Sequence, residues 1–124
     1  MRTFFALFLT LLVSQTATAA ANPPGPDCGN THSTPELNDC ERKLYEAADR
    51  ALNSEYKNTR ARLSPPARAK LLQDQRAWVK QRDPTCKADL TGEEGGTIWK
   101  SLYSICLAEA TRERTQKLRT WIGK

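Results

Sequence analysis

Four cysteines are the residues of this 124-residue chain with the clearest potential for chemistry: Cys28, Cys40, Cys86 and Cys106. They are separated by 12, 46 and 20 positions, whereas structural zinc sites usually draw their thiolates from close pairs. His32 is the only histidine, and no C-x-x-C redox pair is present. The spacing therefore favours two disulfides and predicts neither a metal nor a cofactor.

Four acidic residues in the first half of the chain suggest a second kind of chemistry, because paired carboxylates can hydrolyse glycosidic bonds. They are Glu36, Asp39, Glu41 and Glu46. All four fall early in a predicted helix, where acidic side chains simply favour the positive end of the helix dipole. His32 has no evident Ser or Cys nucleophile as a partner. We therefore expect a protein that is not an enzyme.

The first residues have the pattern of an export signal. Residues 1–19 combine a positive Arg2, an apolar run of about ten residues and an A-x-A cleavage pattern. The run is too short for a membrane span, which needs about 20 residues. We predict cleavage near Ala19 or Ala21, release into the periplasm or medium, and an oxidising environment in which cysteines form disulfides.

The rest of the chain divides into an irregular lead-in at 20–33 and a single helical domain at 34–124. Apolar side chains recur every three or four residues from Leu37 onward, which predicts a first helix over about 35–63. Thr34 is a candidate N-cap. Ser33 and Glu36 also fit a capping box, which would place the cap one residue earlier.

Proline and glycine suggest where the other helices begin and end. Pro65 suits the first position of a second helix, and Asp83-Pro84 is expected to end it, since proline disfavours helical geometry in the preceding residue. Residues 84–96 are expected to form a loop before Thr97 caps a third helix that ends near Gly123. No segment alternates like a strand. We predict an all-α, three-helix antiparallel bundle.

The short connection at 63–65 folds the first two helices into a hairpin. The start of the first helix then meets the end of the second and the start of the third, which gathers all four cysteines at one end. This geometry favours Cys28–Cys40 and Cys86–Cys106, although four cysteines permit three pairings.

Charge is distributed unevenly between the two ends. Without Arg2, the chain has 18 Lys and Arg and 14 Asp and Glu. The cysteine end, residues 27–49 and 80–100, sums to −4, and the opposite end, residues 50–79 and 101–124, sums to +8. Such asymmetry orients a protein toward charged partners.

The basic end suggests one function: a non-enzymatic envelope interaction or stress protein that binds anionic surfaces. Nucleic acid is not an expected partner of an exported protein. The cations proposed for this contact are Arg60, Arg62, Arg68 and Lys70.

Several short motifs occur in order along the chain. They are Asp27-Cys28; Thr34-Pro-Glu-Leu-Asn-Asp-Cys40; Tyr45-Glu-Ala-Ala-Asp49 with Leu52-Asn53 and Tyr56; Gln75-Arg-Ala-Trp78 with Arg82-Asp83 and Cys86; Gly95-Gly96-Thr97; and Cys106-Leu107 with Thr111, Arg114 and Leu118. This ordered set resembles the LprI-type lysozyme-inhibitor family of small exported bacterial domains. The resemblance implies a helical, disulfide-bonded periplasmic domain that binds and inhibits a lysozyme.

Most of the motif residues also have a structural interpretation. Tyr56 and Trp78 occur at core spacing, and Asp49 and Asn53 could bond across helices to Arg82 or Arg76. Six residues are therefore assigned motif and structural roles: Asp49, Asn53, Tyr56, Trp78, Arg82 and Asp83.

The predicted loop at 84–97 is the candidate recognition surface. It contains Asp89, Glu93 and Glu94, and Cys86 would anchor it. We expect it to act by occlusion, with a rigid loop entering a cleft rimmed by basic residues.

Overall fold

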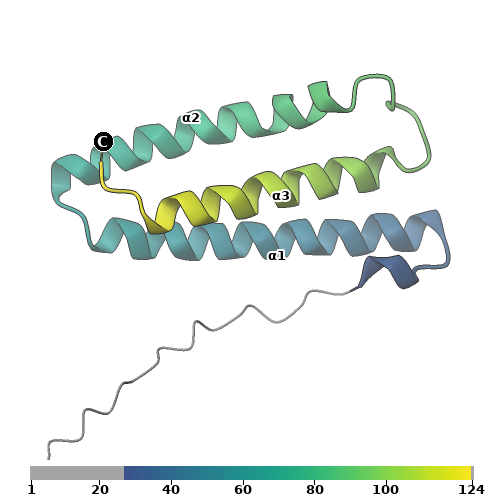
Figure 1. Ribbon diagram of the computed structural model, residues 1–124, viewed down its shortest axis with the longest axis horizontal. Helices are drawn as coiled ribbons and strands as arrows, with labels where there is room; N and C mark the ends of the chain where they lie inside the picture. Colours follow the sequence, from purple (N-terminus) through teal and green to yellow (C-terminus); the bar gives the residue numbers. More distant parts are fainter. Residues whose placement is uncertain (1–26, 124) are drawn as a thin grey trace, which may run out of the picture.

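The computed structural model describes residues 27–123, which form one short 3-10 helix and three α-helices (Figure 1). Successive α-helices run antiparallel, so α1 and α3 are parallel. The most extensive packing is between α1 and α3, and α2 lies against α3 with fewer contacts. The predicted all-α, three-helix fold is confirmed. The helices are η1, Cys28–Asn30; α1, Thr34–Ala61; α2, Pro65–Asp89; and α3, Trp99–Arg119.

The start of α1 is fixed by side chains. Ser33 is the N-cap, and its hydroxyl accepts a hydrogen bond from the Glu36 amide at 3.3 Å. The Glu36 carboxylate in turn accepts from the His32 amide at 2.9 Å. This reciprocal pattern satisfies amides that the helix itself leaves unpaired. The earlier of the two predicted caps is the observed one.

Arg62 and Arg68 hold together the end of the bundle at which α1 ends and α2 begins. α1 ends at Ala61, two residues before the predicted end, and the Arg68 Nε then donates to the carbonyls of Arg60 at 3.0 Å and Leu63 at 2.9 Å. Arg62 donates to the last carbonyls of α3, those of Leu118 and Arg119. These bonds pair carbonyls that a helix end leaves without intrahelical partners. We call this end, with its α1–α2 turn, the hairpin end.

The predicted end of α2 at Asp83-Pro84 is wrong, because the helix continues through Pro84 to Asp89. Pro84 has no amide to donate to the carbonyl of Lys80, but both residues are exposed, so that carbonyl can be solvated. Beyond the proline, Cys86 is bonded to α3 and holds the following turns in place. The predicted loop at 84–96 is therefore reduced to residues 90–98.

The predicted cap at Thr97 is also wrong. α3 begins at Trp99 after Ile98, and no side chain caps it. Thr97 lies within a turn that precedes the helix, because the Trp99 amide donates to the Gly96 carbonyl at 3.3 Å. α3 ends at Arg119, before the predicted end near Gly123.

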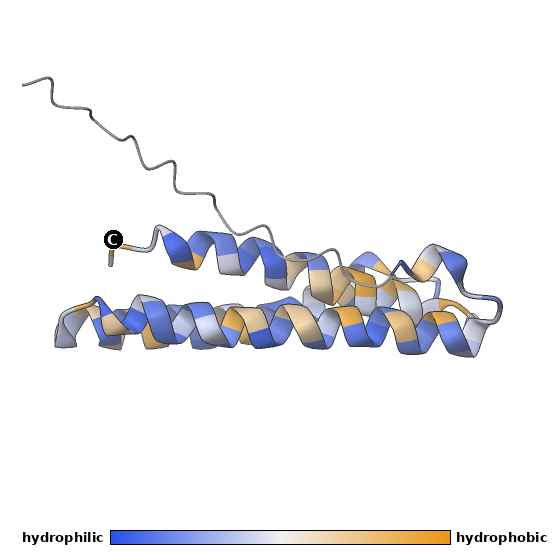
Figure 2. Cartoon of the chain, turned by 90° about the horizontal axis from the view of Figure 1, so that it is seen from below, coloured by the Kyte–Doolittle hydropathy of each residue, from blue (hydrophilic) through white to orange (hydrophobic). Residues whose placement is uncertain are grey.

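The apolar core is small. Each α-helix contributes one leucine to a buried cluster, namely Leu52, Leu71 and Leu118. Figure 2 shows that hydrophilic residues predominate along the helices and that apolar positions occur in short patches. The side chains packed around the cluster are only partly buried: Tyr56, Leu63, Trp78 and Trp121.

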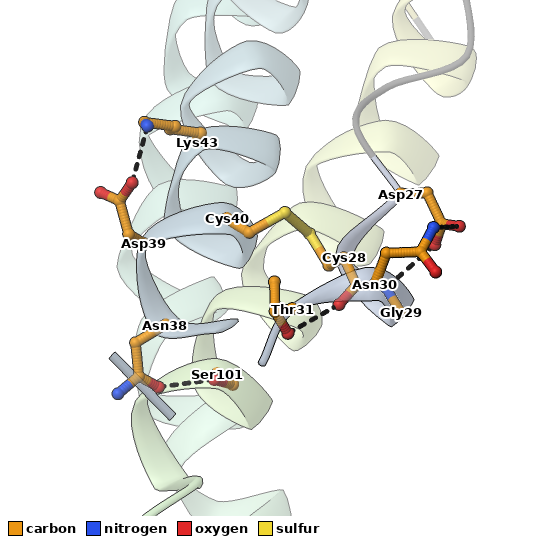
Figure 3. Close-up of a disulfide and its surroundings, with 10 residues drawn as sticks. All are labelled: Asp27, Cys28, Gly29, Asn30, Thr31, Asn38, Asp39, Cys40, Lys43 and Ser101. Atoms are coloured by element: carbon orange, nitrogen blue, oxygen red, sulfur yellow. Dashed lines mark hydrogen bonds and ion pairs between the residues drawn. A yellow bond between two sulfur atoms is a disulfide. The ribbon is translucent and has the colours of Figure 1, made fainter. Parts of the chain in front are cut away.

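Both disulfides lie toward the other end, which we call the cysteine end. Cys28–Cys40 ties η1 to α1, and Cys86–Cys106 ties the last turns of α2 to α3. The favoured pairing is confirmed. Beside the first bond, the Ser101 hydroxyl donates to the Asn38 side-chain oxygen at 2.5 Å, which joins the starts of α1 and α3 (Figure 3).

The predicted signal at 1–19, its cleavage near Ala19 or Ala21, and residues 20–26 of the lead-in lie outside the described residues. Across residues 27–123, no helix has the length and apolar character needed to cross a membrane.

Candidate partner-binding site

The α2–α3 loop is a chain of tight turns at the cysteine end. The Glu93 amide donates to the Leu90 carbonyl and the Gly96 amide to the Glu93 carbonyl, both at 3.0 Å. Gly92 and Gly95 have φ values of 98° and 82°, a region that favours glycine over other residues. The backbone bonds and the adjacent disulfide give this loop a defined shape.

The three predicted contact residues differ in their availability. Asp89 is the last residue of α2, whereas Glu93 and Glu94 lie in the loop, and all three are exposed. The Glu94 carboxylate accepts the Gly92 amide at 2.8 Å and so supports a turn. Within residues 27–123, the carboxylates of Asp89 and Glu93 bond to no other side chain, so both are available to a partner.

Two of the four acidic residues early in α1 are paired with neighbouring cations. Asp39 pairs with Lys43 at 2.6 Å and with Arg42 at 2.5 Å, and Arg42 also pairs with Glu46. Hydrogen bonds from Lys43 and Arg42 lower the pKa of the Asp39 carboxyl. Asp39 and Glu46 are therefore paired with cations, whereas Glu36 and Glu41 form no ion pair within residues 27–123.

The family motif residues meet farther along the bundle, around two arginines of low exposure. The Arg82 side chain is 9% exposed; its Nε lies 2.8 Å from Asp83 and its Nη1 lies 3.6 Å from Asp49 of α1. Its guanidinium also lies over the rings of Tyr45 and Trp78, 5.3 Å from each centroid. Arg82 thus links α2 to α1 through charge and cation–π contacts.

Arg114 makes the equivalent link between α3 and α2. Its side chain is 8% exposed, its Nη2 lies 2.8 Å from Asp74, and its Nε donates to Gln75 at 2.8 Å. The same guanidinium lies 5.7 Å from the Trp78 centroid, and the Trp121 indole donates to Asp74 at 3.0 Å. We call the set centred on Arg82, Trp78 and Arg114 the arginine–tryptophan cluster.

Burial and charge act in opposite directions on Arg82. Burial alone would lower the pKa of its guanidinium, but the hydrogen bond to Asp83 and the nearby Tyr45 and Asp49 raise it instead. Arg82 therefore keeps its positive charge in an interface that is partly shielded from water. The cluster therefore holds α2 against α1 and α3.

Sequence reasoning found part of this cluster. It placed Trp78 in the core and linked Asp49 and Asn53 to Arg82 or Arg76. The observed partner of Asp49 is Arg82, but the prediction for Asn53 is wrong, because its side chain donates to Asp49 within α1 at 3.2 Å. It did not assign Arg114, Asp74 or Trp121 to the interface. The sequence did contain a signal for Arg114. This residue lies four positions after Ala110 and four before Leu118, so its cation falls on the apolar face of α3.

The two tyrosines near Arg82 predict a loss of stability at alkaline pH. Burial raises the pKa of Tyr45, which Arg82 only partly opposes, and burial also raises the pKa of Tyr103. A folded-state pKa above the unfolded value gives stability that is complete below the unfolded pKa of about 10 and is lost as the pH rises through the folded value.

We expect the free energy of unfolding to decline above this pH less steeply in Tyr45→Phe, and still less in Tyr45→Phe/Tyr103→Phe. Urea unfolding at a series of alkaline pH values measures these slopes. Slopes equal to that of the unmodified protein in both variants would contradict the assignment.

No grouping of three or more His, Cys, Asp and Glu side chains suited to a metal ion occurs in residues 27–123.

Comparison with known proteins identifies the family of this chain. The model of the family described as "Lysozyme inhibitor LprI" matches residues 27–118, which include both disulfides and the Arg82, Trp78 and Arg114 side chains. An uncharacterized protein of Rhizobium meliloti (strain 1021) is 36% identical over 124 aligned residues, covering 90% of this chain and 89% of that protein. No solved structure matches the chain. The matched region and its paired cysteines show that this chain belongs to the LprI lysozyme-inhibitor family.

Proposed function

We propose that this protein is an exported inhibitor that binds a lysozyme and blocks its active-site cleft with the α2–α3 loop. The family match over residues 27–118 is the observation that carries the inhibitory role. Membership of an inhibitor family also supports a non-catalytic protein. Export is proposed from residues 1–19 and from the two disulfides, which are typical of oxidising compartments.

The loop is the proposed contact because it is exposed, shaped and acidic. Cys86–Cys106 fixes the base of the loop, so little ordering is needed when it binds. The unpaired carboxylates of Asp89 and Glu93 complement cations at the rim of a cleft. Glu94 has a supporting role, since its carboxylate holds the Gly92 turn.

A turbidity assay with bacterial cell walls, the purified protein and lysozymes of several classes tests both parts of the proposal. We expect inhibition of at least one class, weakened at least about tenfold by Asp89→Lys/Glu93→Lys, because two attractive contacts become repulsive. Glu109→Lys/Glu113→Lys, on exposed positions of α3, makes the same change of charge away from the loop and should alter inhibition less than about twofold.

Two outcomes would contradict different parts of this proposal. Lack of inhibition of every lysozyme class would contradict the inhibitory function. Inhibition that both double variants retain equally would contradict the loop as the contact surface.

A further inference from the structure

A groove lies between the second half of α1 and the first turns of α2, near the hairpin end. Its volume is about 630 Å³, within the range typical of small-molecule sites. Three of the seven residues that line it are cationic and none is acidic. The lining residues are Asn53, Tyr56, Lys57, Arg60 and Ala61 of α1 and Arg68 and Leu72 of α2.

The cations of this groove are not neutralised by the protein. Other arginines of the hairpin end have acidic partners, since Arg62 and Arg119 both lie within 4 Å of Glu55. By contrast, the side chains of Lys57, Arg60 and Arg68 form no ion pair within residues 27–123. Three positive charges therefore line the groove, and no acidic side chain of residues 27–123 pairs with them.

Arg68 is held in position before any ligand arrives. Its Nε donates to the carbonyls of Arg60 and Leu63, whereas its Nη groups donate to no described residue. A guanidinium that is already fixed loses little side-chain entropy when it binds an anion. Arg68 also lies in the first turn of α2, which contains no acidic residue and adds a partial positive charge.

We propose that this groove binds a ligand with closely spaced phosphate groups. A phosphate monoester concentrates about 1.5 to 2 negative charges in a small volume, which matches three clustered cations. The two arginines can each form paired hydrogen bonds with phosphate oxygens, and Lys57 adds a point charge. Tyr56 and Leu72 supply apolar contact for an attached organic group.

This inference is independent of the proposed inhibitory function. The groove is near the hairpin end and the α2–α3 loop is at the cysteine end, so the two surfaces lie at opposite ends of the bundle (Figure 1). A phosphorylated ligand and a lysozyme could therefore be bound at the same time. The phosphate could belong to a free molecule or to a lipid headgroup.

Calorimetric titration of the purified protein with pyrophosphate tests the groove. We expect saturable binding at one site, with Lys57→Gln and Arg60→Gln each weakening affinity at least about tenfold. Neither side chain forms a hydrogen bond or ion pair with another described residue, so both variants should fold. Lys70→Gln and Arg76→Gln remove the same charges from exposed α2 positions outside the groove and should each change affinity less than about twofold.

Other outcomes would overturn the proposal. These are absence of saturable binding, equal weakening by all four variants, or citrate binding as tightly as pyrophosphate.

Phosphatidylcholine vesicles with and without phosphatidic acid distinguish the two sources of the phosphate, a lipid headgroup and a free molecule. Groove-dependent vesicle binding that pyrophosphate displaces identifies a headgroup, whereas pyrophosphate binding without vesicle binding identifies a free ligand. Vesicle binding unaffected by Lys57→Gln and Arg60→Gln would contradict the site.

Discussion

Trp78→Ala is expected to lower the free energy of unfolding by about 3 kcal/mol. The indole packs against the leucine cluster and also lies beneath the guanidiniums of Arg82 and Arg114. Truncation would leave a cavity and remove the cation–π contacts of two cations with very little exposure to water. The contacts with Arg114 and with the leucine cluster join α2 to the other helices, so their loss should affect the whole bundle.

Urea unfolding with both disulfides intact measures this effect. Val79→Ala is a matched control, since Val79 is the next residue of α2 and is 46% exposed. We expect it to change the free energy by less than about 0.5 kcal/mol. Similar losses in the two variants would show that Trp78 has no special role in holding α2.

The second large effect is expected from Cys86→Ser/Cys106→Ser. The bond closes a segment of 20 residues, so its removal should cost about 3 kcal/mol in the chain-entropy model. We expect a second effect beyond this loss of stability, on the local structure of α2 and on inhibition. α2 has few contacts with its neighbours, so loss of this bond should also release the last turns of α2 after Pro84 and weaken any lysozyme inhibition by the loop.

The matched control is Cys28→Ser/Cys40→Ser, which opens a segment of 12 residues between η1 and α1. We expect a comparable loss in the free energy of unfolding, about 3 kcal/mol, but inhibition that is unchanged while the protein is folded. Urea unfolding and the turbidity assay are measured on both variants. Equal inhibition by the two variants would contradict a role for Cys86–Cys106 in shaping the loop.

The sequence predicted the helices and the disulfide pairing for clear physical reasons. Apolar side chains at three- and four-residue steps define α1, and the short connection before Pro65 places the cysteines at one end. Helix ends were less predictable. Pro84 disfavours a helix locally, but the contacts of Arg82 with Asp49 and Tyr45 of α1 and the Cys86–Cys106 bond to α3 come from tertiary structure and outweigh that preference.

The candidate sites were predictable to different degrees. Trp78 and Arg82 could be placed at an interface because they lie on the periodic face of α2. The groove could not be predicted, since it depends on the separation of α1 and α2 and on how Arg68 bonds to backbone carbonyls. From the sequence, Arg60 and Arg68 were assigned only to a general contact with an anionic surface, and Asn53 and Tyr56 only to motif and structural roles. Arg62 was included among the cations for an anionic surface, but its guanidinium bonds to the end of α3.

The arginine contacts at the hairpin end also limit how the length of this chain can vary. Arg62 and Arg68 flank a very short connection, and both reach backbone carbonyls at fixed positions. An insertion here would move the guanidiniums away from their acceptors and leave two helix ends unpaired. The α2–α3 loop bonds mainly to itself, so extra residues there would disturb no interhelical contact. Insertions and deletions in related proteins should therefore concentrate in that loop, where a change of length could also alter the partner recognised.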